Sequence, residues 1–128
     1  MQDRPNAAEL AQAVREFIET EVLPRIDDPR LRFRTLVAAN GLGILEREIA
    51  LGAPLVRREV GSLTRLLGHA DPLPEDLEEL RRRASELNRE LALRIRAGDI
   101  PAGTLAHLMA TVADKLRIAS PRYLERYR

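Results

Sequence analysis

The 128-residue sequence contains no cysteine and no tryptophan, and only two phenylalanines and two tyrosines. Without cysteine the chain can form neither disulfides nor thiolate metal sites, which agrees with a reducing compartment, and we expect a cytoplasmic protein. Long hydrophobic runs are also missing, because charged residues interrupt every apolar stretch. The sequence therefore predicts no membrane-spanning helix and no signal peptide in the first 28 residues.

An excess of one charge is missing as well, since 21 basic and 20 acidic residues leave a net charge of +1. A nucleic-acid-binding domain presents a strongly basic surface, so this balance argues against a nucleic-acid partner. Of the basic residues, Lys115 is the one lysine. The sign of the local charge alternates along the chain, which is typical of neighbouring helices that attract one another.

The sequence shows helical periodicity along its whole length. Apolar residues recur at steps of three and four, and no segment shows the alternation of a strand. Helices are expected at residues 7–23, 29–51, 53–67, 74–97 and 104–119, followed by a short helical turn at 121–127. Because the connections are short, sequential helices should be antiparallel neighbours. The prediction is an all-α fold, a single domain over residues 1–128 formed by a bundle of about five helices.

Specific residues predict where these helices begin and end. Asn6 with Glu9 three residues later is typical of a capping box. Gly52 is expected to end the second helix, Pro74 to open the fourth, and Thr104 to cap the fifth. The fifth helix is expected to face inward with its apolar residues Leu105, Leu108, Met109, Val112, Leu116 and Ala119.

Two glycines, Gly41 and Gly43, lie in the middle of the second helix. Each costs about 1 kcal/mol relative to alanine in a helix interior. Close approach of another helix is the expected reason for them.

Three polar residues lie on stripes that are otherwise apolar: Asn40, Asn88 and Lys115. In one interpretation the two asparagines hydrogen-bond across the bundle and fix its register, while Lys115 reaches solvent. In the other, all three line a pocket for an anionic, acyl or phosphate-bearing small molecule. Both interpretations follow from the same rule, that a buried polar group needs a partner.

The last segment of the chain combines tyrosine with arginine: Arg117, Arg122, Tyr123, Arg126 and Tyr127. The two tyrosines are one helical turn apart, and this composition is typical of protein interfaces. We expect a protein partner to bind here or on an exposed face of the second helix. A homodimer is an alternative. The alternative is a tail that folds back over the end of the bundle.

No catalytic, cofactor or metal site is predicted. His69 and His107 are the only histidines, and neither has a second ligand at one-turn spacing. No serine follows a strand, as a nucleophile elbow requires, and the glycines at 41–43 lie within a helix instead of a phosphate loop. We therefore expect a protein that is not an enzyme.

Four blocks of the sequence together resemble a family of small bacterial domains of unknown function: residues 2–24, 30–52, 87–100 and 108–124. Members of that family accompany phosphotransferases of the aminoglycoside-kinase type and acyl-CoA dehydrogenases. The resemblance implies an accessory domain with one of these two kinds of protein as its partner, and it implies no catalytic residue. A small-molecule binding protein or minor enzyme, with its pocket at the three polar residues named above, remains the alternative.

Overall fold

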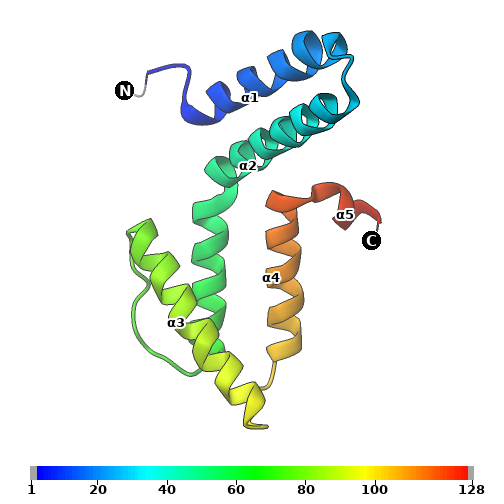
Figure 1. Ribbon diagram of the computed structural model, residues 1–128. Coiled ribbons are helices and arrows are strands. Elements are labelled where there is room, and N and C mark those ends of the chain that lie inside the picture. The colour runs from blue at the N-terminus through cyan, green and yellow to red at the C-terminus, as the bar shows by residue number, and fades with distance from the viewer. Residues whose placement is uncertain (1–2, 127–128) are drawn as a thin grey trace.

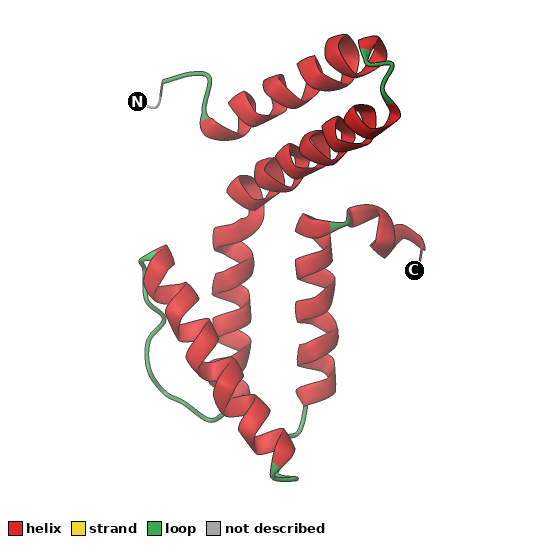
Figure 2. Cartoon of the chain, viewed as in Figure 1, coloured by secondary structure: helices red, strands yellow, loops and turns green. Residues whose placement is uncertain are grey.

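The computed structural model describes residues 3–126, and in that range it contains helices and loops but no strand (Figure 1, Figure 2). The predicted all-α fold is confirmed. The α-helices are α1 (Ala7–Phe17), α2 (Pro29–Leu66), α3 (Leu77–Arg96), α4 (Thr104–Ala119) and α5 (Pro121–Arg126). A π-helical turn, Ile18–Val22, and a 3-10 turn, Leu23–Arg25, continue α1 toward α2.

The N-terminal boundaries of the helices agree with the local sequence signals for α1 and differ from them for α3. α1 begins with the predicted capping box, in which the backbone N–H groups of Asn6 and Glu9 each donate to the other's side chain at 2.9 Å. α3 begins three residues later than expected, because the Asp76 carboxylate accepts a hydrogen bond from the Glu79 N–H and so caps the helix at Leu77.

α4 also starts differently from the prediction. Its N-cap is Gly103, whose φ of +91° is left-handed, and Thr104 is the first helical residue. The Thr104 hydroxyl donates to the Pro101 carbonyl at 2.7 Å instead of capping the helix.

The largest difference from the expected helices is in the middle of the chain. The two helices expected at 29–51 and 53–67 form one helix of 38 residues, α2, with Pro54 inside it. The predicted boundary at Gly52 is therefore wrong. A proline removes one hydrogen bond and crowds the preceding turn, which bends a helix without having to end it. The axis of α2 changes direction in its middle part (Figure 1).

This bend divides the molecule into two regions. We call α1 with residues 29–51 of α2 the arm, and residues 52–66 of α2 with α3 and α4 the body. In the arm, α1 runs back along the first half of α2, so the two helices are antiparallel (Figure 1). In the body, α3 and α4 both pack against α2. α3 runs in the same direction as this half of α2, because Glu48, Glu59 and His69 contact Arg81, Asn88 and Glu90 in the same order along the chain. The expectation that sequential helices are antiparallel is therefore wrong for α2 and α3, since the connection at residues 67–76 returns the chain to the other end of α2 before α3 begins (Figure 1).

The buried apolar core lies in the body, between α2 and α3. It consists of Val60, Leu63, Leu80, Ala84, Leu87 and Leu91. The buried residues of α4 are all polar: Thr104, His107 and Asp114. The expectation that α4 faces inward with its apolar residues is thus wrong, because its polar side faces α2 and most of its apolar side faces solvent.

The two mid-helix glycines of the arm differ. A Cβ at Gly43 would lie 3.5 Å from Cδ of Arg15 on α1, so the expected close approach is confirmed there. At Gly41 a Cβ would have no neighbour within 4 Å in the part of the chain that the structure describes.

Candidate functional site

The polar groups that α4 buries meet polar groups of α2, and together they form what we call the polar seam. The seam consists of Arg58, Glu59 and Ser62 on α2 and His107, Asp114 and Lys115 on α4. It forms because α4 packs against α2 with its polar side. Three separate interactions make up the seam.

The first is an ion cluster at Asp114, whose side chain is 12% exposed. Arg58 donates to both carboxylate oxygens, with Nε 2.8 Å from Oδ2. Arg117, one turn further along α4, donates to Oδ1 at 2.7 Å. The hydrogen bonds and charge of Asp114 raise the pKa of Arg58. Charge-assisted bonds of this kind are stronger than neutral ones, so Asp114 anchors α4 to α2.

The second interaction centres on Glu59, whose side chain is also 12% exposed. The Asn88 amide of α3 donates to Glu59 Oε1 and to the Ala84 carbonyl, both at 2.9 Å. Lys115 Nζ lies 3.7 Å from the same Glu59 oxygen. Glu59 therefore joins all three helices of the body.

These contacts place the three polar residues singled out from the sequence. Asn88 and Lys115 come together at Glu59, a residue that sequence reasoning missed. Asn40 lies apart from them, exposed on the arm, where it lines a groove of about 470 Å³ near Arg47 and Arg122. Asn88 thus pairs with Glu59 and Ala84 instead of Asn40.

The third interaction joins Ser62 Oγ and His107 Nδ1 at 2.7 Å. His107 is buried, and within residues 3–126 its Nε2 has no hydrogen-bond partner. Burial lowers the pKa of His107; the negative charge of Glu59 opposes this shift, and the positive charge of Lys115 adds to it. The imidazole is therefore held in its neutral form near pH 7.

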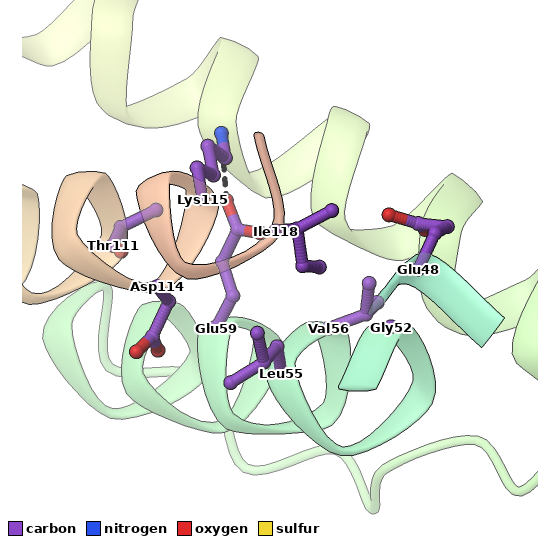
Figure 3. Close-up of a pocket in the computed structure, with 9 residues that line it drawn as sticks. All are labelled: Glu48, Gly52, Leu55, Val56, Glu59, Thr111, Asp114, Lys115 and Ile118. Atoms are coloured by element: carbon purple, nitrogen blue, oxygen red, sulfur yellow. Dashed lines mark ion pairs between the residues drawn. The ribbon is translucent and has the colours of Figure 1, made fainter. Parts of the chain in front are cut away.

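A small pocket of about 180 Å³ lies along the seam (Figure 3). It is lined by Glu48, Gly52, Leu55, Val56, Glu59, Thr111, Asp114, Lys115 and Ile118. In Figure 3 Glu59 of α2 points across the gap toward Lys115 of α4. Each of the three carboxylates that line the pocket is already paired with a cation: Asp114 with two arginines, Glu48 with Arg81 and Glu59 with Lys115.

The chain's family affiliation bears on this site. The family model described as Domain of unknown function (DUF6285) matches residues 24–123. The chain belongs to this family. The DUF6285 match includes the whole polar seam, α3 and α4, whereas α1 precedes it. Searches of curated proteins and of solved structures found no match.

In this DUF6285 chain, four of the five C-terminal residues expected to bind a partner lie within the described range. Arg117 is bound by Asp114, while Arg122, Tyr123 and Arg126 lie exposed on α5, directly after the end of α4. Tyr127 lies outside the described residues. That these residues form a partner-binding surface stays a prediction.

Neither a metal site nor a membrane-spanning helix is found among the described residues. No group of three or more histidine and carboxylate side chains between residues 3 and 126 is placed to hold a metal ion. In the same range, none of the helices combines the length and the apolar character needed to cross a membrane.

Proposed function

We propose that this DUF6285 chain is a non-enzymatic accessory domain that binds a partner protein through one face of α4. This face, which we call the α4 face, consists of Leu105, Leu108, Met109 and Val112, exposed by 74%, 39%, 67% and 54%. Their spacing places them on one side of the helix. A contiguous exposed apolar stripe of this kind marks a protein interaction site, and it is the observation that carries the proposal.

The polar seam explains why the α4 face points outward. Asp114 and His107 lie on the opposite side of the helix and are bonded to Arg58 and Ser62 of α2. Rotating α4 so that its leucines become buried would break these hydrogen bonds. Each polar group left buried without a partner would cost about 1–3 kcal/mol. The helix therefore presents its apolar side to solvent in a fixed orientation.

The chemistry of the α4 face suits a helix-in-groove contact. Leucine, valine and methionine at one-turn spacing are the anchors that such grooves accept, and methionine adapts readily to an irregular surface. The exposed Arg122 and Arg126 of α5 follow at the C-terminal end, so the matching rim of the partner would be acidic.

The partner we propose is a phosphotransferase of the aminoglycoside-kinase type or an acyl-CoA dehydrogenase. The support for this choice is the sequence resemblance, in which such proteins accompany the domain. An accessory role also fits a chain whose described residues carry no metal cluster. Its one buried histidine in that range, His107, is bonded to a serine, and no carboxylate hydrogen-bonds to its other ring nitrogen.

The alternative, a small-molecule site, has weaker support. The pocket between α2 and α4 holds about 180 Å³, which is small for a ligand site. Lys115, the cation expected to bind an anionic ligand there, is already paired with Glu59.

The experiment is a direct binding measurement with each candidate partner from the same genome, purified and titrated by calorimetry. The wild-type chain is expected to bind one of them, and Leu105→Glu combined with Met109→Glu to weaken binding at least about tenfold. Leu93→Glu on α3 is the control, because Leu93 is similarly exposed and lies off the α4 face.

Circular dichroism would establish that the α4 double variant keeps its helices. Failure of both candidate partners to bind, or equal binding by wild type and the α4 double variant, would refute the proposal.

A further inference from the structure

We infer that the arm is completed by the arm of a second copy of this chain, in a two-fold dimer where two helical hairpins stack into a four-helix bundle. This inference concerns a surface separate from the α4 face and does not depend on the function proposed above. It rests on the pattern, the extent and the charge of the apolar residues that the arm exposes.

The arm exposes apolar residues on both of its helices. Eleven of the nineteen large hydrophobic residues that are exposed in the described chain lie within the arm. One set recurs at steps of four and three on α1: Leu10, Val14 and Phe17. A second set follows α2 at multiples of the same steps: Leu31, Leu45 and Ile49.

Helix geometry places these two sets on one side of the hairpin. The buried residues Ala11 on α1 and Ala39 on α2 mark where the two helices face each other. At 100° per residue, each exposed set lies about a quarter turn from its buried alanine, and in the same rotational sense. Because the helices are antiparallel, equal offsets in the same sense point to the same side. This is the side of the arm to which both helices contribute exposed apolar residues. The other exposed apolar residues of α2 in the arm, among them Phe33, Val37 and Ile44, lie on its opposite side, where α1 exposes none.

The accessible surface of the chain is larger than a folded monomer of its size should have. A globular chain of 14.4 kDa is expected to expose about 6,800 Å². This chain exposes 9457 Å², which is about 2,600 Å² more. Two chains together carry about 5,200 Å² of such excess, and obligate homodimers bury about 2,000–5,000 Å² or more from the two chains together, so the excess corresponds to the upper end of what a permanent dimer removes.

The charges of the arm determine how two copies would be oriented. Residues 7–22, on α1, contain four glutamates and one arginine, whereas residues 29–51, on α2, contain four arginines and two glutamates. Stacking α1 on α1 would bring together two segments that each carry four glutamates against one arginine. Stacking α1 of each copy on α2 of the other pairs opposite charges, and this arrangement is consistent with two-fold symmetry.

The first test is the mass of the full chain in solution, measured by light scattering during gel filtration. The wild type is expected at about twice 14.4 kDa. Val14→Glu combined with Leu45→Glu should give a monomer, since both substitutions place a carboxylate in the centre of the interface. The matched control is Leu105→Glu with Met109→Glu on the α4 face, which should remain a dimer.

A milder pair, Val14→Ala with Leu45→Ala, covers the case in which the charged variant unfolds. It should raise the dissociation constant of the dimer at least about tenfold while circular dichroism still shows helices. A wild-type monomer at every concentration would overturn the inference. So would a dimer that the α4 variant breaks and the arm variants leave intact.

The orientation can be tested by cross-linking, because the chain has no cysteine of its own. Chains carrying Val14→Cys and chains carrying Leu45→Cys are mixed under oxidising conditions. A disulfide between the two kinds of chain, formed faster than in either sample alone, is the expected result. Preferential Val14→Cys to Val14→Cys linkage would overturn the pairing of α1 with α2 of the other copy.

Discussion

The arm and the body are built from the same kind of amphipathic helix, yet only the body has an apolar core. In the body, six buried apolar residues lie between α2 and α3. In the arm, α1 and α2 bury only alanine and glycine against each other: Ala11, Ala39 and Gly43. Two helices bury their larger side chains where a further segment covers the space between them, and in the body the connection after α2 supplies this cover by packing Leu67 and Leu73 against the core.

Polar contacts do not compensate for the missing core of the arm. Arg15 of α1 bonds to Glu46 of α2 with its Nε and Nη2 at 3.2 and 3.1 Å, and to Glu19 at 3.4 Å. These side chains are about one quarter to one third exposed, and ion pairs of that kind contribute at most about 1 kcal/mol. Arg47 of the arm also donates to the Ile118 carbonyl of α4 at 2.7 Å. In the proposed dimer, most of the added stability of the arm comes from burial of its apolar side chains.

The largest expected effect contrasts a leucine of the body with one of the arm. Leu63→Ala empties a fully buried position and should lower the free energy of unfolding by about 2–5 kcal/mol at any protein concentration. Leu45→Ala should have little effect in dilute protein, and an effect that grows with concentration as dimers form. Chemical denaturation at several protein concentrations measures both. Equal and concentration-independent losses would abolish the distinction between the two regions.

A smaller effect is expected where α4 joins the body. Asp114→Ala removes the carboxylate that anchors α4, and should lower the free energy of unfolding by about 1–2 kcal/mol. Asp99→Ala is the control, because Asp99 pairs with Arg94 at 2.9 Å but is 69% exposed, so its loss should cost less than about 0.5 kcal/mol. Equal losses in the two variants would show that α4 is not held by the seam.

Glycine substitutions should raise stability in the arm and lower it in the body. Gly41→Ala should gain about 0.5–1 kcal/mol, since nothing in the described chain would meet the new methyl group. Gly98→Ala should lose about 1 kcal/mol, because Gly98 has a φ of +80°. Thermal melting reports both. A loss for Gly41→Ala would show that another surface approaches Gly41 closely in solution.

The smallest expected effect is a pH dependence confined to the body. Because burial lowers the pKa of His107, the unfolded chain binds a proton more readily than the folded one. The contribution of His107 to stability is therefore fully present above about pH 6.5 and declines as the pH falls below it. Denaturation at several pH values should show a shallower decline for His107→Gln than for the wild type. Identical declines would exclude His107 as a source of the dependence.

The sequence predicted the fold where the deciding interactions are local. The Asn6–Glu9 capping box and the end of α3 at Arg96, one residue from the predicted end at 97, each involve a few neighbouring residues. The helix through Gly52 and Pro54 was missed, because sequence shows the cost of a proline but not whether a bend accommodates it. Which side of α4 packs against α2 was predicted wrongly, because periodicity identifies an apolar stripe without showing whether that stripe faces a neighbouring helix or solvent.

The candidate site was also predictable only in part from the sequence. Asn88 and Lys115 interrupt their apolar stripes, and that signal pointed to two residues that the fold brings to Glu59. Glu59 carries a similar signal, three residues after Val56 and four before Leu63, but is easily overlooked among so many charged residues. Asn40 could not be separated from the other two without the bend in α2, which places it on the arm.

The continuity of α2 has a mechanical consequence. A helix of 38 residues is about 57 Å long when measured along its bent axis, and because it is unbroken, α2 transmits the position of the arm to the body like a bent strut. If two arms pair, two such struts hold the two α4 faces at a set distance from each other. A partner with two equivalent binding sites at that distance would be held at both, and its release would require both contacts to open at once.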